Sequence, residues 1–199
     1  MLSTLTRVDD AVLAQIEEEK QIRRTRELFL LFGLGSQFDH LIALALGKIG
    51  VFCKVADPAT IRAADVRRLN PIGIILSGGP VSVHINPPDF DAQIFNIGFP
   101  TLGICLGFQL LAQHAGATVR TGERREYGVH PLTISDGTCA LRTDIESGTP
   151  VLQSHGDVIE PHPALECFGS TEHSPMAVGR AGHLWGVQFH PEVSDTPCG

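Results

Sequence analysis

Residues 101–116 read TLGICLGFQLLAQHAG, in which a short apolar segment passes through the turn GICLG (103–107) directly into a helical pattern. A strand that enters a helix through a nucleophile flanked by glycines is the arrangement of the G-x-S-x-G elbow. Glycines allow the turn to be tight and the neighbouring backbone to come close. The turn would lift the Cys105 sulfur above the sheet, at a helix N-terminus that favours the thiolate. The alternative is a buried cysteine at a strand end, beside two glycines that pack a helix.

Short apolar segments alternate with helical patterns before this turn. Strands are expected at LFLLFG (28–33), VFCKVA (51–56), IGIILS (72–77) and TLGI (101–104), and helices at 36–50, near 89–96 and at 106–116. This alternation is typical of a parallel sheet that helices cover on both faces. The fold class expected is therefore α/β, with an open, mixed, mostly parallel sheet.

The second half of the chain has a different pattern. Beyond Gly116 the strands become short and turn-rich, at ATVRTG (117–122), HPLTI (130–134), PVLQS (150–154), LECFGS (165–170), MAVGR (176–180) and HLWGVQF (183–189). Closely spaced short strands of this kind favour antiparallel pairing. We expect them to extend the same sheet in the C-terminal half, so that residues 28–199 form one domain.

The first 27 residues differ from the rest in composition. Residues 9–27 are strongly charged, lack Gly and Pro, and carry only a short apolar stripe at Val12, Leu13 and Ile16. This pattern predicts a charged helical arm over residues 1–27. Two interpretations stay open: an exposed extension, or a helix that docks on a partner.

The overall composition is that of a globular protein. Of the 199 residues, 43% are hydrophobic and 19% are charged, and the net charge is −7. An acidic protein is not expected to have nucleic acid or an anionic membrane as its main partner. No apolar run approaches the ~20 residues that span a bilayer. Acidic residues stand near the N-terminus where a secretory signal would be apolar, so a cytoplasmic location is expected.

The cysteines and histidines form no metal or disulfide pattern. The five cysteines include no CxxC pair, which fits neither a disulfide framework nor a zinc ribbon. The histidines show no HExxH or other close ligand spacing, so no metal site is expected. The cysteines are Cys53, Cys105, Cys139, Cys167 and Cys198.

A second candidate group is QFHPE at residues 188–192. In an extended stretch, a histidine and a carboxylate two residues apart point the same way. One nitrogen of His190 could then face the Cys105 thiol while the other donates to Glu192, which fixes the tautomer. The alternative is a surface histidine beside an unrelated glutamate, and the cysteine elbow argues against it.

The glycine-rich turn SGGP (77–80) follows the third expected strand, at the sheet edge where α/β folds place ligands. Such a turn can aim the Gly79 N–H at a developing oxyanion, with the Leu106 N–H as the second donor. SGGPVS also resembles the SGGxDS phosphate loop of ATP pyrophosphatases. Pro80 lacks an N–H, however, and Val81 stands at the aspartate position, so a nucleotide site is not expected here.

His155 stands out among the remaining histidines. It lies in QSHGD (153–157), which we expect to form a polar turn after a strand. The turn could line the pocket or could be a capped structural turn, and composition alone favours neither.

Together these segments resemble the class I glutamine amidotransferases, and among them the amidotransferase domains of GMP synthetases. The resemblance covers residues 28–199. Segments shared by the whole class are GICLG, FHPE and SGGP. Segments typical of the GMP synthetase type are FGLGSQFDHLIA (32–43), IILSGGPVSV (74–83), REYG (125–128), SHGD (154–157) and GVQFHPEVSDTPCG (186–199).

The resemblance implies a triad of Cys105, His190 and Glu192 that hydrolyses L-glutamine to glutamate and ammonia. Cys105 would attack the side-chain carbonyl and form a γ-glutamyl thioester. His190, oriented by Glu192, would protonate the departing ammonia and then activate water.

The resemblance also implies roles around this triad. Backbone N–H groups of Gly79 and Leu106 would stabilise the oxyanion. The amino-acid end of the substrate would be held by Gln109 and by the turn Ser154, His155, Gly156 and Asp157.

The sequence departs from the resemblance at three points. Family members usually carry aspartate at the position of Gly33 and often an aromatic residue at that of Leu106. They also continue beyond the TPxG segment into an ATP pyrophosphatase domain, and we expect no cofactor site in this chain itself. The implied partner is therefore a synthetase domain or subunit that carries ATP and Mg²⁺, for GMP synthesis from XMP.

Three other functions stay open from the sequence. They are an amidotransferase of another biosynthetic pathway, a stand-alone γ-glutamyl hydrolase with the same triad, and a regulatory relative that only binds a partner. The intact triad argues against the last of these.

Overall fold

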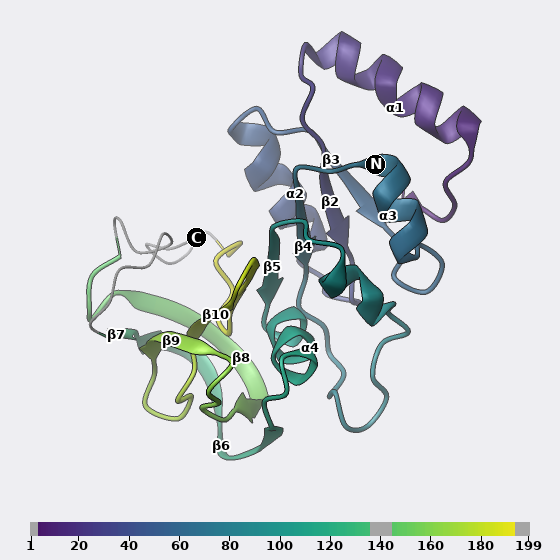
Figure 1. Cartoon of the computed structure of the whole chain (residues 1–199). Helices are drawn as coiled ribbons and strands as arrows, with labels where there is room; N and C mark the ends of the chain where they lie inside the picture. Colours follow the sequence, from purple (N-terminus) through teal and green to yellow (C-terminus); the bar gives the residue numbers. More distant parts are fainter. Residues whose placement is uncertain (1–3, 136–144, 194–199) are drawn as a thin grey trace.

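The structure, a computed structural model, describes residues 4–135 and 145–193 and contains a nine-stranded main sheet (Figure 1). The strands of this sheet are β1 (Thr4–Leu5), β2 (Phe29–Phe32), β3 (Cys53–Ala56), β4 (Gly73–Leu76), β5 (Thr101–Ile104), β7 (Thr133–Ile134), β9 (Glu166–Ser170), β10 (Val178–Ala181) and β11 (Leu184–Val187). They lie in the order β1-β3-β2-β4-β5-β11-β10-β9-β7. Neighbours from β1 to β11 pair in parallel, and those from β11 to β7 pair antiparallel. The predicted fold class is confirmed.

Both faces of the parallel half are buried because its strands are apolar on both sides. Along β2, the successive residues Leu30 and Leu31 belong to different cores, as side chains that alternate across a strand must. Helices α3 (Ala63–Leu69) and α4 (Leu106–His114) cover the first face, and α2 (Asp39–Lys48) covers the second. Two-sided burial explains why these strands read as continuous apolar runs.

Two long strands, β6 (Val119–Pro131) and β8 (Pro150–Ile159), form a separate antiparallel pair (Figure 1). The expectation that all C-terminal strands extend the main sheet is therefore wrong for these two, although it is right for β7, β9 and β10. The strand expected at 130–134 is also divided, since it contributes the end of β6 and the whole of β7. The β6–β8 pairing places Glu126 directly opposite His155.

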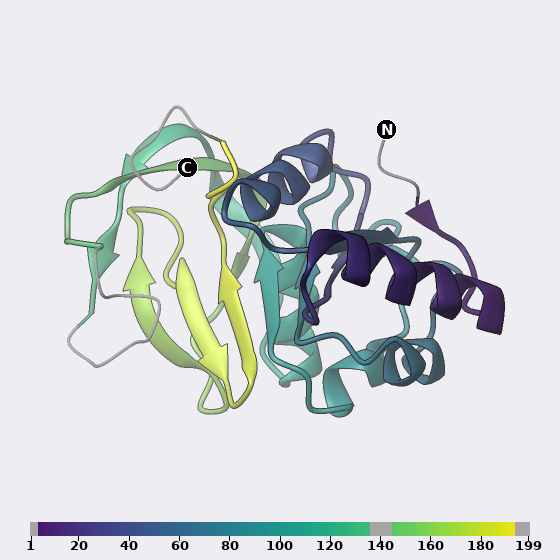
Figure 2. The same cartoon turned by 90° about the horizontal axis from the view of Figure 1, so that it is seen from above.

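Helix α1 (Asp10–Arg23) forms in the charged N-terminal segment, as predicted. Asp9 caps its first turn by accepting a backbone hydrogen bond of 2.9 Å. The interpretation as an exposed extension is wrong for the inner face of the helix, because Ile16 is only 2% exposed and packs into the main core. Lys54 on β3 also forms a 2.7 Å ion pair with Glu19. Figure 2 shows this helix at the end of the molecule away from the antiparallel strands. The domain boundary after residue 27 stays a prediction.

Two short helices differ from expectation. The helix expected near 89–96 is a 3₁₀ helix, η1 (Ala92–Asn96). Helix α3 was not expected, because a segment of 7 residues is too short to display a periodic apolar pattern. Its start is stabilised by Asp65, whose side chain accepts the Arg62 N–H at 3.0 Å. Among the described residues, no helix is long and apolar enough to cross a membrane.

Candidate active site

Cys105 stands at the junction of β5 and α4, as the elbow pattern predicted. Its backbone has φ 51° and ψ −106°, a conformation that residues with a Cβ seldom adopt. The Cys105 N–H donates to the Val187 carbonyl of β11 at 2.8 Å, so the neighbouring parallel strand helps to hold this conformation. The residue therefore lies where the strand ends and the helix begins, and it lines a cavity of about 780 Å³.

The glycines on either side of Cys105 are required by close packing. A Cβ on Gly103 would lie 2.5 Å from the Gly107 carbonyl carbon, and a Cβ on Gly107 would lie 2.5 Å from the Leu76 carbonyl oxygen. Side chains in proteins do not approach backbone atoms so closely, so either substitution would force α4 away from the sheet. The two glycines thus place the helix, and with it the nucleophile.

His190 and Glu192 lie just beyond β11, where their side chains meet. His190 Nδ1 is 2.8 Å from Glu192 Oε1, and both side chains are buried. Because an ionised carboxylate only accepts, Nδ1 donates and Nε2 faces the thiol. A Cβ on Gly78 would lie 2.9 Å from His190 Cε1 and 3.5 Å from Cys105 Cβ, which shows that all three residues share one corner of the site.

The sequence argument for His190 and Glu192 was right about the pair but wrong about the backbone. The two side chains were expected to align along an extended strand. Instead β11 ends at Val187, and Pro191 and Glu192 lie in a turn closed by the Val193 N–H on the His190 carbonyl at 3.4 Å. The turn brings the carboxylate back onto the imidazole, which strand alternation alone would not do.

The environment of His190 favours its protonated form. Burial by itself would lower the pKa of His190, but contacts with Cys105 and Glu192 outweigh burial and raise that pKa to about 10. An imidazolium beside the sulfur stabilises a thiolate by direct charge attraction. The site therefore places an imidazole that keeps its proton near neutral pH beside the Cys105 side chain.

The glycine-rich turn after β4 lies against the elbow. A Cβ on Gly79 would lie 2.5 Å from the Leu34 carbonyl oxygen and 2.7 Å from Leu106 Cδ2. Gly79 and Leu106 both line the cavity beside Cys105. Neither N–H donates a hydrogen bond to another residue of the part of the chain that the structure describes. Two amide donors are thus available beside the sulfur, as an oxyanion site requires.

The residues assigned to the amino-acid end of the substrate all line the same cavity. Gln109 Nε2 donates to the Asp157 carbonyl at 3.4 Å, and Cys105 Sγ lies 3.9 Å from the Ser154 carbonyl. The expectation of a turn at residues 154–157 is wrong, because these residues belong to strand β8. In this strand the His155 side chain is buried beside Glu126, and its Nδ1 lies 2.9 Å from the Asp157 carbonyl oxygen.

Two residues that the sequence analysis did not single out also shape this region. Ser82, after the glycine-rich turn, donates to Asp157 Oδ2 at 2.5 Å and closes one wall of the cavity. Glu126, in the charged run of β6, is completely buried beneath β8 beside His155. The segment REYG (125–128) carries part of the resemblance, but its local pattern does not show that Glu126 is buried, since that depends on the partner strand.

The described residues contain no group of three or more His, Cys, Asp or Glu side chains that could hold a metal ion. The groups that the candidate site presents are the thiol of Cys105, the imidazolium of His190, the carboxylate of Glu192 and the backbone amides.

Cys105 should be the preferred site of alkylation near neutral pH. The protonated imidazole of His190 lies beside Cys105 at the cavity, whereas burial raises the pKa of the Cys53 thiol to about 11 and keeps it protonated. Brief treatment of the folded protein with a glutamine-like electrophile, followed by peptide mapping, measures this selectivity. Cys139 and Cys198 lie outside the described residues and serve as internal comparisons. Equal labelling of Cys53 or Cys139 would contradict the assignment.

This chain belongs to the class I glutamine amidotransferase family, whose family model matches residues 30–199. Within that class it is similar to GMP synthases. The GMP synthase [glutamine-hydrolyzing] of Caldanaerobacter subterraneus subsp. tengcongensis is 41% identical over 178 residues, covering 87% of this chain and 34% of the relative. That of Trichormus variabilis is 40% identical over 198 residues, covering 97% and 36%. The chain thus spans about a third of the length of these relatives.

Solved structures show the same fold. A candidate GMP synthase subunit of Thermoplasma acidophilum superposes with a TM-score of 0.75 at 22% identity, covering 86% of this chain and 87% of the other. A glutamine amidotransferase of Thermotoga maritima superposes with a TM-score of 0.70 at 20% identity, covering 84% and 77%. The predicted family resemblance is confirmed.

Proposed function

We propose that this chain hydrolyses L-glutamine to glutamate and ammonia through Cys105, His190 and Glu192. The observation that carries the proposal is the meeting of two distant segments: a cysteine at a strand–helix elbow, and a histidine whose other nitrogen is held 2.8 Å from a buried carboxylate. A nucleophile, a proton carrier and an orienting group in this order are the parts of a covalent acyl-transfer site.

The proposed reaction has two half-reactions. The Cys105 thiolate attacks the side-chain carbonyl carbon, and the resulting oxyanion accepts hydrogen bonds from the Gly79 and Leu106 amides. His190 gives its proton to the leaving nitrogen, so that the C–N bond breaks, ammonia departs and a γ-glutamyl thioester remains. The neutral imidazole then takes a proton from water, and the hydroxide breaks the thioester. Glu192 holds the ring in one tautomer throughout.

The substrate's amino-acid end is assigned to the wall opposite the oxyanion turn. There Gln109, Ser154, Gly156 and Asp157 place backbone and side-chain polar groups on the cavity. The Ser154 carbonyl, which lies 3.9 Å from Cys105 Sγ, would accept from the α-amino group of glutamine. His155 contributes through its backbone, since its ring lies in the protein interior.

We further propose that the ammonia passes to an ATP pyrophosphatase synthetase domain or subunit, for GMP synthesis from XMP. The support is the similarity to proteins named GMP synthase [glutamine-hydrolyzing], of which this chain spans only about a third. ATP and Mg²⁺ belong to that partner. A cytoplasmic location is part of the same proposal.

The chain alone should hydrolyse glutamine slowly, and a synthetase carrying its ATP-activated acceptor should stimulate it about 5- to 150-fold, the usual range of coupling between sites. The reason is that closure of the turn at Gly79 would be favoured only in the complex. Glutamate release is measured with and without a GMP synthetase partner, XMP, ATP and Mg²⁺, and omission of XMP is the control. Full activity in the isolated chain would favour the stand-alone hydrolase. Stimulation only by another synthetase would identify a different pathway.

A further inference from the structure

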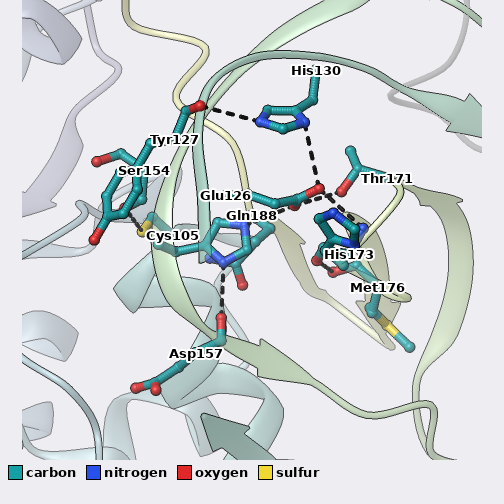
Figure 3. Close-up of polar contacts among 12 residues, drawn as sticks. Cys105, Glu126, Tyr127, His130, Ser154, Asp157, Thr171, His173, Met176 and Gln188 are labelled. Atoms are coloured by element: carbon teal, nitrogen blue, oxygen red, sulfur yellow. Dashed lines mark hydrogen bonds and ion pairs between the residues drawn. The ribbon is translucent and has the colours of Figure 1, made fainter. Parts of the chain in front are cut away.

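Glu126 is a buried carboxylate that lies outside the proposed triad and has four polar neighbours. Its side chain is 0% exposed. Oε2 accepts the Thr171 hydroxyl at 2.7 Å, and Oε1 accepts the His173 N–H at 3.1 Å. His155 Nε2 lies 3.3 Å from Oε2, and His130 Nδ1 lies 3.7 Å from Oε1. Figure 3 shows Glu126 among Thr171, His173 and His130.

The hydrogen bonds of His155 determine where its proton must be. Its Nδ1 lies 2.9 Å from the Asp157 carbonyl oxygen, which can only accept, so Nδ1 carries a hydrogen. A neutral ring would then present the lone pair of Nε2 to Glu126 Oε2. Two acceptors facing each other 3.3 Å apart in a buried site would repel. Burial lowers the pKa of His155 and disfavours a full imidazolium, so a proton shared between His155 Nε2 and Glu126 would relieve this repulsion.

This buried pair is connected to the wall of the active site. The Asp157 carbonyl accepts from His155 Nδ1 and also from Gln109 Nε2 at 3.4 Å. One residue before His155, the Ser154 carbonyl lies 3.9 Å from Cys105 Sγ. Because His155 Nδ1 and Gln109 Nε2 meet at this carbonyl, a fixed His155 ring also fixes the strand segment 154–157 relative to helix α4.

We propose that Glu126 is a positioning residue for glutamine binding, which shares one proton with His155 and thereby fixes the strand segment 154–157 at the cavity. The inference rests on the proposed function, because that segment is assigned to the amino-acid end of glutamine. Glu126 touches neither the sulfur nor the reacting carbonyl. Its removal should therefore weaken substrate binding more than it slows the chemical step.

Glu126→Ala should raise KM for glutamine about tenfold, as expected when buried partners such as the Thr171 hydroxyl lose a hydrogen bond, and should change kcat much less. The rate of Cys105 alkylation by iodoacetamide should stay at the wild-type value, because the triad is intact. Glu123→Ala, on the same strand but exposed, is the matched control and should shift KM by no more than about twofold. A purely structural role would lower the melting temperature and leave KM of the folded protein unchanged.

A second variant, Glu126→Gln, tests the positioning role of Glu126 even if Glu126→Ala does not fold. The amide NH₂ can donate to both Thr171 Oγ1 and a neutral His155, so KM should return to near the wild-type value. NMR of the imidazole nitrogens (¹⁵N, assigned with His155→Gln) and of the Glu126 carboxyl carbon (¹³C) should find one proton on this pair in the wild type and an unprotonated Nε2 in Glu126→Gln. A wild-type protein in which His155 Nε2 and the Glu126 carboxyl are both unprotonated would overturn the shared proton. An unchanged KM in folded Glu126→Ala would overturn the positioning role, and glutaminase activity retained by Cys105→Ala would instead overturn the proposed function.

Discussion

Cys105→Ala should lower kcat for glutamine hydrolysis by at least about 10⁴-fold, because the members of a nucleophilic triad act as a unit. The Cys105 sulfur is the atom that would form the proposed covalent intermediate, and no other described cysteine lines the cavity. The fold should survive, since alanine keeps the Cβ that the backbone conformation at φ 51° already accommodates. Steady-state glutamate release measures the loss, and circular dichroism with thermal melting checks the fold.

The same variant separates the two halves of the proposed reaction. In complex with its synthetase, Cys105→Ala should lose glutamine-dependent amination yet still aminate the acceptor when free ammonium is supplied. The physical reason is that the variant removes only the source of ammonia. Cys53→Ala, at the other buried cysteine described, is the control and should keep glutamine-dependent amination. Wild-type glutaminase activity in purified Cys105→Ala would contradict the assignment of Cys105 as the nucleophile.

His190→Ala should lower kcat about 10- to 100-fold further than Glu192→Gln, following the ranking of proton carrier and orienting carboxylate in known triads. The imidazole itself moves the proton, whereas Glu192 Oε1 orients the ring through a single 2.8 Å contact. Glutamine in place of glutamate retains an acceptor for Nδ1, so part of the orientation persists. Glutaminase rates of the two purified variants, each corrected for folded fraction, make the comparison. The reverse order would show that the two roles are misassigned.

The pKa of His190, measured in the wild type and in Glu192→Gln, tests the contact between these two side chains. The folded pKa of about 10 lies above the ordinary value of 6.5, so the folded chain keeps a proton that the unfolded chain releases between these values. The resulting stabilisation is complete below pH 6.5 and is lost as the pH rises through about 10. Because the Glu192 carboxylate helps to raise this pKa, the imidazole should titrate at a lower pH in Glu192→Gln. An NMR titration that gives the same midpoint for both proteins would contradict this contact.

The parallel half of the fold could be predicted because its information is local. Each of the strands β2, β3, β4 and β5 is a short apolar run bounded by turn residues, and each helix that was predicted carries its own pattern. Cys105 could be singled out for the same reason, since the glycines that allow its close packing are two residues away on either side. The candidate triad needed one further step, the pairing of two such local motifs.

Other features could not be predicted because they depend on contacts between distant segments. Residues 117–122 and 150–154 read as ordinary short strands, and only their pairing with each other separates β6 and β8 from the main sheet. Helix α1 reads as a solvated arm because its apolar stripe is short: Ile16 is buried, and only Val12 and Leu13 join it in partial contact with the core.

By itself, the sequence determined the α/β fold class, the elbow at Cys105 and the family, because glycine spacing and apolar periodicity constrain the chain locally. Only the tertiary structure decided how His190 reaches Glu192, since a turn rather than strand alternation joins them. It also decided that Glu126 is buried while Glu123, three positions earlier, is exposed. The physical reason is that burial of a charge depends on donors such as Thr171, which lies 45 residues away along the chain and meets Glu126 only after folding.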